Sequence, residues 1–162
     1  MTDHRHVNFH ASDPTEVVAE MQGMASRADG KSWLNVTPFL TQEQEAIMAD
    51  RTGVAGWFTG RGSDLPLATW VPANMARRKP DPPSLGIQHG MGSNALERLE
   101  ENGLVLPESW VKQQDSGKRG IVLAIPVRIP HIEIVNYLTA AIAQLTPYVE
   151  FGMHFRADVV RV

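Results

Sequence analysis

The sequence predicts a single α+β domain over residues 1–162, with a mixed or mainly antiparallel sheet packed against about four helices. The first observation is length, because 162 residues form a typical single domain and bury roughly 70% of the unfolded surface. The second is composition, since 43% apolar and 20% charged residues are typical of a globular protein. The third is that helical apolar spacing alternates with short aromatic or β-branched runs.

The first helix is expected over residues 14–27. Asp13-Pro14-Thr15-Glu16 supplies a capping aspartate, a proline at the first helical position and a capping-box glutamate. Apolar residues then recur at helical spacing. The run Trp33-Leu34-Asn35-Val36 predicts a strand, and Pro38 ends it.

A second helix is expected over residues 42–51, because Thr41-Gln42-Glu43-Gln44 has the pattern of a capping box. Residues 56–59 and 67–71 then predict a hairpin around the glycine-containing loop 60–64.

A proline-rich connection over residues 72–83 divides the chain into possible halves, 1–71 and 84–162. It contains four prolines, which exclude a helix interior or a central strand. The order strand, helix, hairpin occurs at residues 33–71 and again at 85–126. This order suggests a βαββ pseudo-repeat, although α+β domains often alternate in the same way.

The second half of the chain predicts two helices and four strands. Gly103 stops the first of these helices and Pro130 begins the second. The strands are expected at 85–89, 110–114, 120–125 and within 148–160, and the helices at 94–102 and 131–145.

Charge and composition exclude several classes of partner. The net charge is −3, so no positive field attracts nucleic acid or anionic lipid. The long apolar segment 132–145 is too short and too polar to span a bilayer, and the first residues lack the apolar core of a signal peptide. Zero cysteines exclude disulfides and thiolate metal sites. We therefore expect a cytoplasmic protein with no membrane or nucleic-acid partner.

The most informative segment is a glycine loop between an expected strand and an expected helix. Gly90-Met91-Gly92-Ser93-Asn94-Ala95 fits the pattern G-x-G-x-x-G/A of dinucleotide-binding loops. Asp115 lies near the end of the next expected strand, where a ribose-binding acid would belong. Gly90, Gly92, Ser93, Asn94 and Asp115 are therefore candidates for binding a phosphate-bearing ligand.

The surrounding sequence favours a structural turn at this loop. The next segment looks like a hairpin, whereas a dinucleotide-binding fold needs a right-handed crossover. The preceding strand carries Gln88 and His89, where a buried parallel strand is apolar. We therefore expect Ser93 or Asn94 to cap the following helix.

His89 is the candidate catalytic residue. It stands at a strand end beside the glycine loop, where a general base could lie, and Asp115 or Glu97 could orient it. The alternative is a histidine that hydrogen-bonds to the loop backbone. The sequence contains no P-loop, no G-x-S-x-G elbow and no cysteine nucleophile.

His4, His6 and His10 are candidate metal ligands. On an extended strand the three imidazoles would point to the same side and could hold zinc or copper. The alternative, which we favour, is a solvated and partly ordered N-terminal arm. His154 is expected to be a sheet-face residue.

The run from Leu85 to Pro126 carries a resemblance to known sequences. The segment LGIQHGMGSNALERL, followed by LPESW and RGIVLAIP, resembles a small uncharacterised bacterial protein family with no known function. The resemblance implies a bacterial protein and brings no activity, cofactor or site residue with it.

The sequence therefore predicts a soluble bacterial protein that acts as a non-catalytic binding or interaction module. Its partner would be an unknown protein or a small anionic ligand, and no cofactor is expected. The alternative is an enzyme or sensor that binds a nucleotide or dinucleotide at Gly90–Asn94. The sequence leaves open whether the chain is an enzyme.

Overall fold

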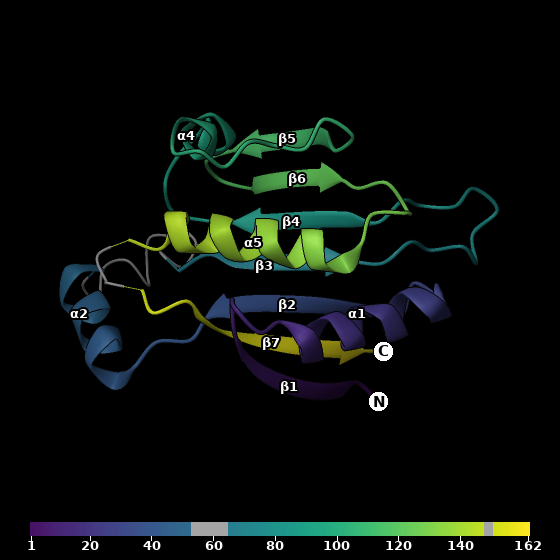
Figure 1. Ribbon diagram of the computed structural model, residues 1–162, viewed down its shortest axis with the longest axis horizontal. Coiled ribbons are helices and arrows are strands. Elements are labelled where there is room, and N and C mark those ends of the chain that lie inside the picture. Colours follow the sequence, from purple (N-terminus) through teal and green to yellow (C-terminus); the bar gives the residue numbers. More distant parts are fainter. Residues whose placement is uncertain (53–64, 148–150) are drawn as a thin grey trace.

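An antiparallel sheet of seven strands organises the chain, in the order β1-β7-β2-β3-β4-β6-β5 (Figure 1). The structure is a computed structural model that describes residues 1–52, 65–147 and 151–162. The strands are β1 (Asp3–His10), β2 (Ser32–Pro38), β3 (Leu67–Val71), β4 (Ser84–Gln88), β5 (Val111–Ser116), β6 (Gly120–Ala124) and β7 (His154–Arg161).

The expected helices are all present. They are α1 (Thr15–Arg27), α2 (Gln42–Thr52), α4 (Ala95–Glu101) and α5 (His131–Leu145). Helices α1 and α5 contact each other and cross one face of the sheet, while α4 contacts β5 and β6 (Figure 1). The prediction of a single α+β domain is therefore confirmed. No helix in the described ranges is long and apolar enough to cross a membrane.

The hydrophobic core lies between the helices and the sheet face that they cover. Strand side chains alternate, so one set points to the helices and is buried in every strand except β5, which has no buried residue. The apolar stripes of α1 and α5 pack against this set, and each large side chain contributes roughly 1.5–3 kcal/mol of burial free energy. The core includes Val17, Met21, Leu34, Trp70, Leu85, Ile87, Leu123, Leu138, Ile142 and Phe155.

The other set of strand side chains forms what we call the outer face of the sheet. The register places Asn35 opposite both Asp158 and Thr69, and Gly86 opposite both Thr69 and Val122. The Thr69 hydroxyl donates to Asn35 Oδ1 over 2.8 Å. The outer face is therefore more polar than the core face.

The N-terminal segment is a strand, so the expectation of a partly ordered arm is wrong. Residues Asp3–His10 pair with β7 along their whole length. Val7 and Phe9 point into the core and are 2% and 7% exposed, respectively. Their burial stabilises the strand. Two apolar residues alone were too few to predict it from the sequence.

Parts of two other predictions lie outside the described residues. The expected strand 56–59 and the loop 60–64 lie outside the described residues. The expected strand 67–71 is present as β3, and it pairs with β2 and β4. The βαββ pseudo-repeat stays a prediction, because one of its two copies includes residues 56–64. The C-terminal strand begins at His154, and residues 148–150 are not described.

Candidate functional site

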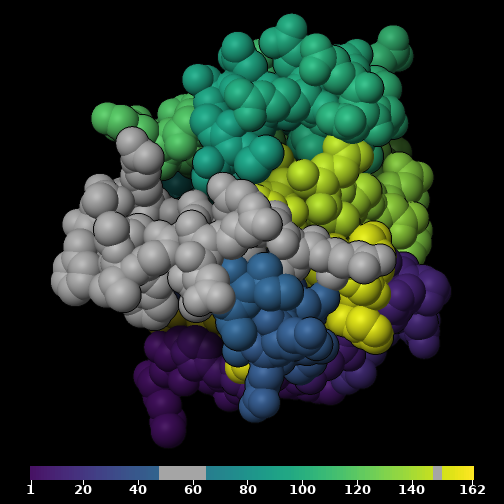
Figure 2. Space-filling view, turned by 90° about the vertical axis from the view of Figure 1, so that its left-hand side faces the viewer, coloured from purple at the N-terminus to yellow at the C-terminus, as the bar shows by residue number. Residues whose placement is uncertain are grey.

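The glycine loop connects β4 to α4. It lies at the end of the sheet that is turned toward the viewer in Figure 2, where α4 is teal and α2 is blue. Gly92 and Asn94 have φ values of +83° and +59°. The Arg98 guanidinium donates to the Met91 carbonyl. Gly117, in the β5–β6 turn, lies so close that a Cβ there would be 3.0 Å from the Ser93 nitrogen. The turn therefore packs directly against the loop.

Asp115 occupies the position that an external anion would take at α4. Its two carboxylate oxygens accept the N–H groups of Ala95 and Leu96, each over 3.1 Å. A negative charge is favourable there because the first amides of a helix lack intrahelical partners. The expected cap from Ser93 or Asn94 is wrong, since Asn94 makes no side-chain cap and β5 supplies Asp115 instead. A phosphate on these amides would have to displace Asp115.

His89 is buried beside this loop and bonds to its backbone. The imidazole is 7% exposed, and Nδ1 accepts the Met91 N–H over 3.2 Å. Burial lowers the pKa of His89, the Asp115 charge opposes this and the Arg98 charge adds to it. The lowered pKa and the acceptor role of Nδ1 both favour the neutral imidazole. Its position matches the alternative of a histidine that bonds to the loop.

Three buried polar atoms near Asp115 have no hydrogen-bond partner among the described residues. They are His89 Nε2, Trp110 Nε1 and Tyr137 Oη. The ring centroids of Trp110 and Tyr137 are 5.0 Å apart. Burial and the Asp115 charge raise the pKa of Tyr137 to about 12. These groups are at most 7% exposed, so a substrate would reach them only if neighbouring residues moved.

The three N-terminal histidines share the outer face but have different neighbours. His4 lies opposite Val160, His6 opposite Asp158 and His10 opposite His154. His6 contacts the Asp158 carboxylate, which also accepts from Arg156 Nε over 3.1 Å. Within the described ranges no three or more His, Cys, Asp or Glu side chains gather as a metal site. The three histidines therefore do not converge on one ion.

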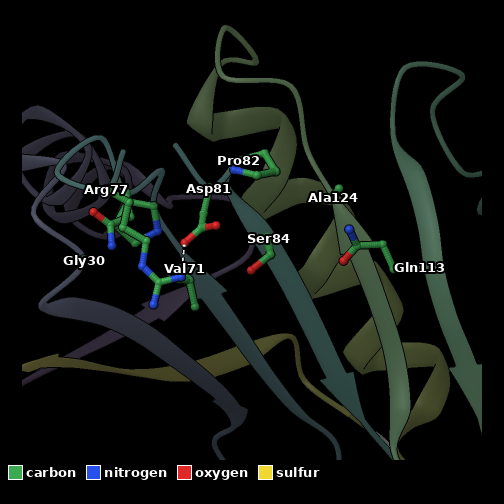
Figure 3. Close-up of a pocket in the computed structure, with 10 residues that line it drawn as sticks. Gly30, Val71, Arg77, Asp81, Pro82, Ser84, Gln113 and Ala124 are labelled. Atoms are coloured by element: carbon green, nitrogen blue, oxygen red, sulfur yellow. Dashed lines mark hydrogen bonds and ion pairs between the residues drawn. The ribbon is translucent and has the colours of Figure 1, made fainter. Parts of the chain in front are cut away.

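The opposite end of the sheet carries a polar pocket that the sequence did not reveal. An open surface pocket of about 430 Å³ lies between loop 72–83 and the outer face, with the Arg77 and Asp81 side chains at its rim 68% and 52% exposed. Its polar side chains come from the loop (Asn74, Arg77 and Asp81), from β4 (Ser84) and from β5 (Gln113) (Figure 3). Arg77 Nη1 is 3.0 Å from Asp81 Oδ2.

Local features of the chain hold the pocket in shape. The backbones of Asn74 and Asp81 exchange two hydrogen bonds of 3.1 Å, which close the loop. The Met75 N–H donates to the Ala28 carbonyl over 3.0 Å, which ties the loop to the end of α1. A bulge between Lys112 and Gln114 leaves Gln113 unpaired in the ladder, and its side chain reaches the pocket (Figure 3).

The sequence predicted only a proline-rich connection at residues 72–83, and no pocket. The signals that it did contain were the Arg77–Asp81 spacing of four residues and the prolines that restrict the backbone. Neither signal indicates which strands the loop covers, so the pocket followed only from the three-dimensional arrangement.

No family model, curated protein or solved structure matches this chain. The function therefore has to be inferred from the geometry of the chain itself.

Proposed function

We propose that this chain is a non-catalytic binding module that holds a small polar ligand in the pocket beneath loop 72–83. One observation carries the proposal, namely that polar side chains from three separate segments line a single cavity. Its volume of about 430 Å³ falls within the usual range for small-molecule sites. The closed loop supports a preformed site, which reduces the entropic cost of binding.

The side chains of the pocket favour a neutral or zwitterionic ligand. Arg77 offers donors and Asp81 offers acceptors, and as an ion pair they contribute no net charge. Ser84 and Gln113 each offer both donors and acceptors. A free amino acid, a short peptide or a polyol has this mixture of groups. A purely anionic ligand would compete with Asp81 for Arg77.

Binding is favoured over catalysis because of the groups that line the pocket. Ser84 is the hydroxyl there, and the described lining has no histidine or lysine to act as its base. Asp81 is already paired with Arg77.

A ligand screen with two neighbouring arginine variants tests this proposal. Amino acids, dipeptides, polyols, nucleotides, NAD(H) and phosphate would be compared by thermal shift. A ligand at 100 times its Kd adds about 2.7 kcal/mol, or roughly 5–10 °C for this chain length. We expect a zwitterion or polyol to give a shift that Arg77→Ala and Gln113→Ala abolish.

Arg78→Ala is the matched control, because Arg78 is exposed and does not line the pocket. It should keep the full shift. A flat screen, or a shift that Arg77→Ala leaves unchanged, would contradict the proposal. A shift with nucleotides alone would favour the glycine loop instead.

A further inference from the structure

Loop 72–83 also borders a second pocket, which lies on the helix side of the sheet. Its volume is about 160 Å³, and it shares no lining residue with the polar pocket. The end of α1, the beginning of α5 and the loop lie together at this end of the fold (Figure 1). The walls consist of alanine, proline, methionine, valine and isoleucine side chains, together with Trp70 and His131. The pocket is therefore mainly apolar.

The size and the lining of this apolar pocket suit one small ring. An engineered apolar cavity of about 150 Å³ in another protein stays free of water and binds benzene. Met75 and Val127 line the pocket and are 58% and 66% exposed, so it reaches the surface beside apolar side chains. The rings of Trp70 and His131 meet edge-on with centroids 5.4 Å apart, and burial lowers the pKa of His131. The lowered pKa favours the neutral imidazole, so the wall suits an uncharged ring.

The beginning of α5 adds polar donors to this wall. The helix starts at His131, and Pro130 provides no side-chain cap. No hydrogen bond joins the N–H of His131 or of Ile132 to another described residue. Trp70 is 1% exposed, and its Nε1–H also lacks a partner among the described residues. A ligand with an acceptor group can bond to such donors, whereas a purely apolar ligand cannot.

The charge at this helix end favours an anionic acceptor. The first amides of a helix carry partial positive charge, and α5 extends over 15 residues. Arg128 lies two residues before Pro130, is exposed and has no ion pair in the described ranges. Glu133 lies in the same turn, but its exposed side chain does not accept from these amides. A carboxylate is the common biological group that fits this end of the pocket.

We propose that the apolar pocket binds a small aromatic carboxylate, with its ring among the apolar walls and its carboxylate at the start of α5. The ring lies against Trp70 and Ile134, and the carboxylate accepts the N–H groups of the first turn of the helix. The site takes a ligand with an apolar body and a negative charge, which differs from the zwitterion or polyol proposed for the polar pocket. It does not depend on that function.

Titration of the ¹⁵N-labelled chain with benzoate tests the site by NMR. We expect saturable changes at the amides of His131 and Ile132 and at the indole N–H of Trp70, while Ser84 and Gln113 in the polar pocket stay unchanged. Benzamide has nearly the same shape but no charge. It should bind about twofold to fivefold more weakly, because an anion at a helix N-terminus is favoured by about that factor.

Two alanine variants of α1 locate the binding. Ala25 lines the pocket, so Ala25→Leu fills part of it and should weaken benzoate binding about tenfold or more. Ala19→Leu is the matched control, because Ala19 is exposed on the same helix and does not line the pocket. It should bind benzoate as the unaltered chain does. The Tm without ligand shows whether each variant is folded, and the NMR map of the unaltered chain requires no variant.

Four results would overturn the proposal. Saturable benzoate binding could be absent, or its NMR changes could lie away from the start of α5. A folded Ala25→Leu could retain the binding, or Ala19→Leu could lose it. Equal affinity for benzoate and benzamide would show that the pocket does not select a carboxylate. Each of these results leaves the proposal for the polar pocket standing, because the ligand screen with Arg77→Ala tests that pocket separately.

Discussion

At the scale of single residues, the Asp115 carboxylate determines what the glycine loop does. It accepts the first amides of α4 and supplies the negative charge that this helix end favours. The sequence drew attention to Asp115 through its place near the end of the strand after the glycine loop, but as a ribose-binding acid. Its contact with α4 depends on how β5 pairs with β6, and sequence spacing does not show this.

Replacing Asp115 should therefore reduce stability. Asp115→Ala removes both acceptors, and we expect the free energy of unfolding to fall by about 1–2 kcal/mol, as for a lost helix cap. Asp115→Asn keeps one acceptor oxygen and should lose less. Urea unfolding measures both, with the exposed Glu101→Ala in the same helix as the control. If Asp115→Ala is as stable as the unaltered chain, the cap contributes nothing.

Two glycines with similar backbones allow steric collision to be separated from conformational strain. Gly103 and Gly120 have φ values of +89° and +76°. A Cβ at Gly103 meets no atom within 4 Å, whereas one at Gly120 would collide with the Ile87 carbonyl oxygen and lie 3.0 Å from the Gln88 Cα. We expect Gly103→Ala to cost about 1 kcal/mol and Gly120→Ala clearly more. Equal losses in urea unfolding would show that β4 and β6 can separate there without cost.

At the scale of elements, we expect the pairing of β1 with β7 to depend on pH. Partial burial favours a higher pKa for Asp158, but hydrogen bonds from His6 and Arg156 and the nearby positive charges outweigh it. The pKa of Asp158 is therefore lowered. A lowered carboxyl pKa stabilises the fold above the unfolded value of about 3.9, and this contribution is lost as the pH falls further.

Asp158→Asn should make unfolding less sensitive to acid. The unaltered chain should lose stability as the pH falls below about 4, and part of that loss should be missing in the variant. Urea unfolding at a series of pH values measures it. Asp3→Asn, on β1, is the control, since Asp3 has no ion pair among the described residues. Parallel pH profiles for the unaltered chain and Asp158→Asn would count against this role.

The sequence predicted the helices from local signals, but the capping box expected at Asp13–Glu16 is wrong, because Pro14 is the N-cap of α1 without a side-chain cap and Glu16 pairs with Arg5. Thr41 and Gln44 form the expected capping box, with reciprocal hydrogen bonds of 2.9 and 3.2 Å. Strand β1 was missed because Val7 and Phe9 are its only core residues, and they are buried only when β7 is beside them. The bulge that turns Gln113 toward the pocket also depends on its partner strand.

At the scale of the whole molecule, strand order determines which residues can act together. The sheet places the C-terminal strand between β1 and β2, so both chain ends lie at the same side of the fold (Figure 1). Helix periodicity and turn residues predicted the α+β class but not this order. The polar pocket and the apolar pocket both result from contacts between distant segments, so neither could be predicted from the sequence.

The central claim, binding in the pocket beneath loop 72–83, is tested most directly by mapping a ligand onto the chain. ¹⁵N-labelled protein would be titrated with the ligand that gives the largest thermal shift, and amide signals would be followed by NMR. The account predicts that the perturbed amides gather at 71–84, Gln113 and Ala124, and that Gly90–Asn94 are unchanged. Perturbations centred on Gly90–Asn94, at the other end of β4, would contradict it.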